Sequence, residues 1–200
     1  MMKSRALLLV VSAPSGAGKT TLCDRFLVDH PFMTRSISCT TRAPRGAEMD
    51  GRDYYFLSPD EFNRRVTEGL FLEHALVHGN QYGTLRGTVE EALKAGKDVL
   101  LVIDVQGAAT IRRAAHLLGG ILGRAYVDIF IAPPSLGALR DRLQKRGEDA
   151  EDVIECRLSA AQDEMARGGE YQYRVVNDNL EQAYAELAAI VQAEHDRNPC

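Results

Sequence analysis

The sequence is poor in cysteine and contains no tryptophan. Its four cysteines are scattered along the chain, at Cys23, Cys39, Cys156 and Cys200. None belongs to a C-x-x-C pair, so the pattern indicates neither a zinc cluster nor a disulfide framework. We therefore expect a protein of a reducing compartment, the cytoplasm.

Long hydrophobic runs are also absent. The longest covers residues 6–11, whereas a bilayer span needs about 20 apolar residues. Lys3 and Arg5 before this run imitate the start of an export signal, but the run is shorter than the roughly 7 to 15 residues of such signals. A phosphate-binding loop, rather than a cleavage site, follows it. We expect no membrane partner and no export.

An excess of positive charge is missing as well. The 24 Lys and Arg residues face 28 Asp and Glu residues, which gives a formal net charge of -4. General nucleic-acid binding relies on a positive field, so we expect no nucleic-acid partner. The 200 residues, 45% hydrophobic and 26% charged, are typical of one globular domain.

The hydrophobic segments predict an α/β fold. Branched apolar residues at 7–11, 99–103 and 127–131 are typical of buried parallel strands, and residues 173–176 suggest a fourth. Helical patterns separate these strands, and alternation of strand and helix favours a parallel sheet with helices on both faces.

Three helix starts are predicted from capping patterns. Ser58 with Pro59 and Glu61 forms a capping box, after which Phe62, Val66 and Leu70 are expected on one face. Thr88 with Glu91 predicts a second helix, which Gly96 ends. Asn179 with Gln182 opens a last helix, which carries Tyr184, Leu187 and Val191 inward.

Two stretches interrupt the alternation of strands and helices. Residues 38–86 are rich in Arg, Tyr, Gly and Thr, contain a short strand-like piece at 54–57, and are interpreted as an insertion. Residues 135–166 are interpreted as a second irregular stretch around Gly147.

A phosphate-binding loop follows the first predicted strand. Residues 13–20 read Ala-Pro-Ser-Gly-Ala-Gly-Lys-Thr, a Walker A pattern with alanine in place of its first glycine. Gly16 and Gly18 let backbone N–H groups surround phosphate oxygens, and Lys19 neutralises the β and γ phosphates. Thr20 places a hydroxyl on Mg²⁺. The expected ATP-binding residues are Ala13, Pro14, Ser15, Gly16, Ala17, Gly18, Lys19, Thr20 and Thr21.

Asp104 is a second expected metal ligand. It ends the apolar strand at 99–103, where a Walker B strand delivers a carboxylate to the ligand-binding edge of the sheet. Its other interpretation is a helix cap. Asp104 to Gly107 also fit the D-x-x-G of GTP-hydrolysing switches, although the chain has no N-K-x-D for reading guanine.

Several further blocks resemble the guanylate kinase family. They are residues 36–45 (Ser-Ile-Ser-Cys-Thr-Thr-Arg-Ala-Pro-Arg), 50–56, 71–73, 79–84, 103–107, 132–135, 142–143, 146–147, 157–161 and 176–178. The resemblance covers nearly the whole chain. It implies a core of residues 1–36, 88–135 and 167–200, a GMP-binding lobe at 37–87 and a mobile lid at 136–166.

The resemblance also implies the site residues. Those for the GMP phosphate are Arg42, Arg45, Tyr54 and Tyr82, and those for guanine are Ser38, Glu73 and Thr84. Guanidinium groups match phosphate bidentately, and a carboxylate can accept from both N1–H and the 2-amino group of guanine. From residue type alone, Glu73 would be an exposed helix-end charge and the arginines would be solvated.

The implied reaction is transfer of the ATP γ-phosphoryl group to GMP, with Mg²⁺ as cofactor and dGMP as a further acceptor. Such transfer depends on charge neutralisation and alignment. The implied catalytic residues are Lys19, Arg142, Arg146 and Arg157, although spacing alone favours solvated helix faces for these arginines. Asn177 is expected to contact adenine, or otherwise to cap a turn.

One position departs from the family pattern. Many members have Asp-Ile-Asp where this chain has Val102-Ile103-Asp104, so one acid near the guanine edge is replaced by valine. Two other functions stay open: an inactive guanylate-kinase-like module that binds phosphopeptides, and a GTPase. The sequence leaves the oligomeric state open, and a homo-oligomer is allowed.

Overall fold

The computed structural model describes residues 5–77, 79–147 and 149–197. Lys3 and Cys200 lie outside them. The main sheet has the order β2-β7-β1-β8-β9, and all its neighbouring strands are parallel. Its strands are β1 (Leu8–Ser12), β2 (Met33–Arg35), β7 (Asp98–Val102), β8 (Tyr126–Ala132) and β9 (Tyr173–Val176). The predicted α/β class is confirmed, and β2 is a strand that the sequence patterns did not indicate.

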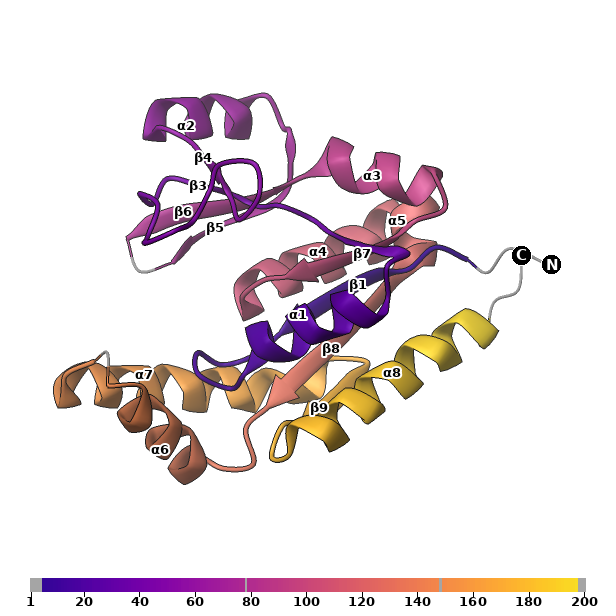
Figure 1. Cartoon of the computed structure of the whole chain (residues 1–200). Helices are drawn as coiled ribbons and strands as arrows, with labels where there is room; N and C mark the ends of the chain where they lie inside the picture. Colours follow the sequence, from indigo (N-terminus) through magenta and orange to yellow (C-terminus); the bar gives the residue numbers. More distant parts are fainter. Residues whose placement is uncertain (1–4, 78, 148, 198–200) are drawn as a thin grey trace.

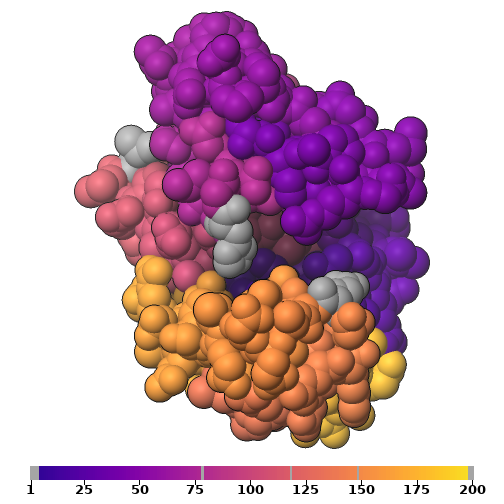
Figure 2. All heavy atoms as spheres, turned by 90° about the vertical axis from the view of Figure 1, so that its left-hand side faces the viewer, coloured from indigo at the N-terminus to yellow at the C-terminus, as the bar shows by residue number. Residues whose placement is uncertain are grey.

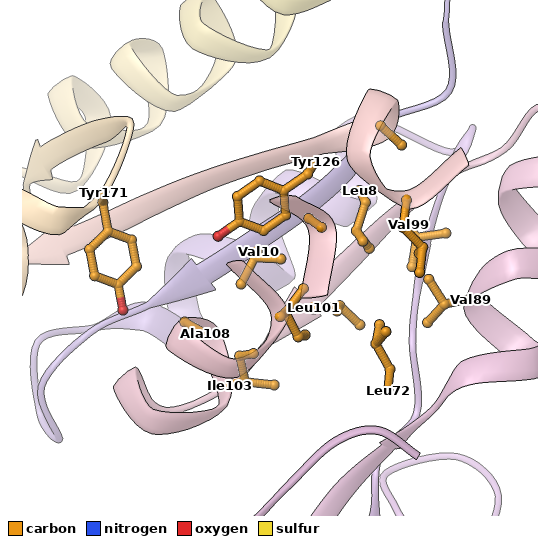
Figure 3. Close-up of a cluster of buried hydrophobic side chains, with 14 of the residues drawn as sticks. Leu8, Val10, Leu72, Val89, Val99, Leu101, Ile103, Ala108, Tyr126 and Tyr171 are labelled. Atoms are coloured by element: carbon orange, nitrogen blue, oxygen red, sulfur yellow. The ribbon is translucent and has the colours of Figure 1, made fainter. Parts of the chain in front are cut away.

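Helices cover both faces of this sheet because successive strand residues point to opposite sides. Leu8 and Val10 of β1 join one apolar cluster, shown in Figure 3, while Leu9 and Val11 join the cluster on the other face. The first face carries α3 (Arg86–Lys94), α4 (Val105–Leu118) and α5 (Gly120–Ala125), and the second carries α1 (Lys19–Asp29) and α8 (Leu180–Arg197).

A second sheet forms a separate lobe above the main sheet (Figure 1). Its strands, in the order β4-β3-β6-β5, are β3 (Cys39–Thr40), β4 (Tyr55–Phe56), β5 (Phe71–Val77) and β6 (Asn80–Leu85), and it carries α2 (Pro59–Thr67). Phe62 of α2 stacks on Phe71 of β5, which closes a small apolar core. This lobe lies within the predicted segment 37–87.

The stretch at 135–166 is helical, so its interpretation as irregular is wrong. It contains α6 (Leu136–Arg146) and α7 (Glu151–Ala166), with the short η1 (Arg167–Glu170) after them. Gly147 ends α6 in a left-handed conformation, φ 67°, and the two helices share an apolar cluster that includes Leu143 and Leu158.

Two details of the predicted helices are also wrong. Leu70 does not share the inner face with Phe62, because α2 ends at Thr67, Gly69 has a positive φ and Leu70 is exposed. Thr88 does not open α3, because β6 runs directly into that helix and Leu85 is its N-cap.

Candidate functional site

Two adjoining cavities lie at the carboxyl edge of the main sheet, where ligands bind in open α/β folds. Figure 2 shows the hollow between the lobe and the α6–α7 pair. One cavity, of about 210 Å³, is lined from the lobe side, and the other, of about 510 Å³, is lined by the Walker loop and α6. Lys19, Asp104 and Val77 line both cavities, so two ligands can meet there.

The Walker loop has the backbone that phosphate binding needs. Gly16 and Gly18 both have φ 87°, a conformation that only glycine adopts without strain. A Cβ on Gly18 would also lie 2.4 Å from the Asn177 side-chain nitrogen. The loop leads directly into α1 at Lys19, so the positive end of the helix dipole faces the larger cavity.

Lys19 lies between the two cavities. Its Nζ donates to the Ile103 carbonyl oxygen at 2.9 Å. Burial lowers the pKa of this amine, while Asp104 and Glu164 act in the opposite direction. An amine held among carboxylates is well placed to accept a phosphate anion as a new partner.

Asp104 is the N-cap of α4, as its helix-cap interpretation predicted. Its Oδ1 accepts from the Gly107 N–H at 2.7 Å. The same side chain lines both cavities, so capping orients the carboxylate and leaves it beside the ligand space.

The oxygen donors of the larger cavity suit magnesium. Thr20, Asp104 and Glu164 offer one hydroxyl and two carboxylates. No cluster of three His, Cys, Asp or Glu residues able to hold a metal occurs in the described parts of the chain. Magnesium is commonly held by one or two protein oxygens, with phosphates and waters as the other ligands, and these residues fit that arrangement.

Glu73 is the buried acid of the smaller cavity and is only 5% exposed. The Thr84 hydroxyl, from the opposite residue of β6, donates to its Oε1 at 2.6 Å. An irregularity in the pairing of β5 separates Phe71, which packs in the lobe core, from Glu73, which faces the cavity. Burial raises the pKa of Glu73 to about 7, opposed by the Thr84 hydrogen bond.

Of the other residues expected at the acceptor site, three line the smaller cavity and the two arginines do not. Ser38, Tyr54 and Tyr82 line the smaller cavity, and the rings of Tyr54 and Tyr82 meet edge to face. Arg42 lies over the Tyr54 ring and donates to Glu48 at 2.9 Å. Hydrogen bonds to Glu48 and Tyr82 raise its pKa. The Arg45 side chain is exposed and does not line this cavity.

The expected catalytic arginines also differ in position. Arg142 and Arg146 line the larger cavity, and Arg142 donates to the Asn177 carbonyl oxygen at 2.7 Å. Arg157 is paired with Asp149 at 2.9 Å and does not line this cavity.

The buried Asn177 side chain contacts the backbone of the Walker loop. It is 6% exposed, and its side-chain nitrogen donates to the Ala17 carbonyl oxygen at 2.8 Å. A contact between Asn177 and adenine stays a prediction.

Two lining residues were not expected from the sequence. Glu164 of α7 lies in the larger cavity, where burial raises its pKa and Lys19 opposes the shift. Val77, at the end of β5, lines both cavities. Neither belongs to a motif of the sequence. Val102, the departure from the family pattern, lines the smaller cavity.

This fold and site define a P-loop enzyme that binds a nucleotide beside a second ligand. Residues 5–194 match the model of the family described as guanylate kinase. A guanylate kinase of Cereibacter sphaeroides is 47% identical over 99% of this chain and 92% of its own length. One of Anaeromyxobacter dehalogenans is 50% identical over 96% and 82%. The crystal structure of guanylate kinase from Anaplasma phagocytophilum, 34% identical, aligns with a TM-score of 0.77 over 97% of this chain and 88% of that chain. The chain belongs to the guanylate kinase family.

Proposed function

We propose that this enzyme transfers the γ-phosphoryl group of magnesium-bound ATP to GMP and releases ADP and GDP. The observation that carries the proposal is the pair of cavities that share Lys19 and Asp104. One has a phosphate-binding loop, and the other has a buried carboxylate beside two tyrosines.

ATP binds in the larger cavity, and its phosphates lie on the Walker loop. Backbone N–H groups of Ser15, Gly16 and Gly18, the α1 dipole and the Lys19 amine offset the phosphate charge. Thr20 and Asp104, with Glu164 nearby, would hold magnesium. When bound, the metal supplies positive charge to the β and γ phosphate oxygens.

GMP binds in the smaller cavity. Glu73 accepts from N1–H and the 2-amino group of guanine, Thr84 orients the carboxylate, and Ser38 adds a polar contact. Tyr54, Tyr82 and Arg42 hold the phosphate, which Arg45 reaches from the lobe surface. Because Val102 brings no acid to this cavity, Glu73 supplies most of the discrimination between purines.

The chemical step needs no side chain as general base. An oxygen of the GMP phosphate, largely ionised at neutral pH, attacks the γ-phosphorus while the bond to the β-γ bridging oxygen breaks. Arg142 and Arg146 from α6 and Arg157 from α7 neutralise the transferring group. The α6–α7 pair acts as a lid over residues 136–166, and its closure excludes water.

A panel of nucleoside monophosphates with ATP and Mg²⁺, followed by coupled ADP production, tests the proposal. We expect turnover with GMP, slower turnover with dGMP and IMP, and none with AMP. Lys19→Ala should abolish turnover and leave the circular dichroism spectrum unchanged. Binding of a phosphopeptide without turnover would favour the interaction module, and GTP hydrolysis without an acceptor would favour a GTPase.

We also propose where the enzyme works and which molecules it binds. Among the described residues Cys23, Cys39 and Cys156 are free, which agrees with work in a reducing cytoplasm. No helix within residues 5–77, 79–147 and 149–197 has the length and apolar character to cross a bilayer. We propose ATP and GMP as the partners, and size measurement in solution decides between a monomer and a homo-oligomer.

A further inference from the structure

Gly107 lies buried in the first turn of α4, between two carboxylates of the site. A Cβ at this position would lie 2.9 Å from Glu73 Oε2 and 3.1 Å from Asp104 Oδ1. A contact of 2.9 Å is shorter than a side-chain carbon tolerates, so something would have to shift. Gly107 is not among the glycines with positive φ, so the space around it, rather than its backbone, is what limits the residue.

Glu73 has little freedom to move away from an added methyl group. Its Oε1 is bonded to the Thr84 hydroxyl at 2.6 Å, and Thr84 is fully buried. Its main chain is paired opposite Thr84 in the lobe sheet. A shift of Oε2 would therefore turn the carboxylate and strain or break the Thr84 hydrogen bond.

A glycine at position 107 does not stabilise helix α4. Glycine inside a helix costs about 0.5–1 kcal/mol relative to alanine. The Gly107 N–H donates to Asp104, but any residue other than proline supplies that donor. What glycine alone provides is space beside Glu73.

We propose that Gly107 determines base specificity by holding open the position of Glu73 Oε2. This role rests on the proposed GMP binding. It also gives the Asp104 to Gly107 segment, which fits D-x-x-G, a function in reading the acceptor base rather than in hydrolysing GTP.

The test is Gly107→Ala, with Gly87→Ala as its matched control. Gly87 also lies in a helix, α3, and a Cβ there meets nothing within 4 Å. We expect Gly107→Ala to raise the Kd for GMP, measured by calorimetry without ATP, at least tenfold. Its KM for ATP should stay within twofold of wild type, and Gly87→Ala should change neither constant. A circular dichroism spectrum and a cooperative thermal transition like those of wild type separate this effect from misfolding.

A second substitution tests the contact itself. Glu73→Asp withdraws the carboxylate by one methylene and makes room for a methyl group at position 107. If the two residues meet as described, the double variant loses less GMP affinity than the product of the two single losses. The preference for GMP over IMP should also fall in Gly107→Ala, because a displaced carboxylate no longer meets the 2-amino group.

Three outcomes would overturn the inference: an unchanged GMP Kd in Gly107→Ala, an equal loss of ATP affinity, which would place the effect at Asp104, or independent losses in the double variant. Failure of the wild type to phosphorylate GMP is a different result. It would refute the proposed function, and with it the role of Gly107 that depends on it.

Discussion

In the proposed reaction, discrimination among bases depends most on Glu73. Its buried carboxylate can accept two hydrogen bonds from guanine, whereas an amide offers one acceptor and a repelling donor. We expect Glu73→Gln to weaken the binding free energy of GMP by about 1–3 kcal/mol and to raise the KM for GMP about 10- to 100-fold. Steady-state kinetics with varied GMP and ATP measure this, and the KM for ATP should not change. Glu186→Gln, at an exposed position of α8, is the control. A GMP KM equal to wild type would remove Glu73 from the base site.

The protonation of Glu73 predicts a pH dependence. Burial raises its pKa to about 7, and the ionised form binds guanine, so GMP binding weakens as pH falls below 7. The ionised fraction of the carboxylate falls from about nine tenths at pH 8 to about a tenth at pH 6, so the Kd for GMP should rise about tenfold over this range. Calorimetry across this range measures it. The same pH series with Glu73→Gln is the control, because it measures the effect of titrating the GMP phosphate alone. An identical dependence of the GMP Kd on pH in wild type and Glu73→Gln would contradict the assignment.

The raised pKa also affects stability. The folded protein binds the Glu73 proton more tightly than the unfolded chain does, so this group's contribution to stability falls as pH rises from about 4.5 to 7. Under the proposed function, the buried position of Glu73 serves ligand binding at a cost to folding stability near neutral pH.

Residues that belong to a motif could be predicted, and those placed only by packing could not. The Walker loop, Asp104 and Glu73 were expected at the site, and the structure brings them together around the two cavities. Glu164 lies there because α7 packs on α6, which no local pattern of Glu164 indicates.

At the level of elements, caps were the most reliable signals. Ser58 Oγ accepts from the Glu61 N–H at 3.2 Å, and Asn179 Oδ1 accepts from the Gln182 N–H at 3.2 Å, as the sequence predicted. The Glu61 carboxylate, the other half of the predicted capping box, pairs with Arg64 and Arg65 instead. Thr88 failed because α3 begins at Arg86, directly after β6, so Thr88 lies inside the first turn and Leu85, which has no capping side chain, is the N-cap. Arg65 and its partner Glu61 show how ion pairs on an exposed helix face add local support that periodicity does not reveal.

The α2 cap gives a stability prediction. Ser58→Ala leaves the Glu61 N–H without its side-chain acceptor, so we expect the free energy of unfolding to fall by about 1 kcal/mol. Urea denaturation measures it. Ser159→Ala, at an exposed position inside α7, should leave stability within about 0.5 kcal/mol of wild type. Equal stability of Ser58→Ala and wild type would mean that the lobe helix does not depend on this cap.

On the scale of the whole molecule, the described structure is open relative to the proposed reaction. The Arg45 side chain is exposed, and Arg157 is paired with Asp149, so neither lines the cavities. In the proposed reaction, Arg157 reaches the transferring phosphoryl group when the lobe and the α6–α7 pair approach each other across the hollow in Figure 2. Arg45 belongs to the same lobe as Tyr54 and Tyr82, so it reaches the GMP phosphate by a movement of its own loop.

This requirement predicts a ligand-dependent change in size. Small-angle X-ray scattering should show a smaller radius of gyration with GMP and a non-hydrolysable ATP analogue together than with either alone. The pair should also raise the melting temperature more than each ligand does separately. An unchanged radius with both ligands bound would mean that Arg157 acts without closure of the lobe and the α6–α7 pair.

The strand that carries Glu73 is anchored in the body of the molecule. Leu72 is buried in the main apolar cluster with Val89 and Ile103 rather than in the lobe core, as Figure 3 shows. In the closure predicted above, the lobe would pivot near the start of β5, so that Glu73 would move little while Tyr54 and Arg42 would move further. Capture of the proposed acceptor would then have two stages: the base would bind first to a nearly stationary surface, and the moving part of the lobe would contact the phosphate afterwards.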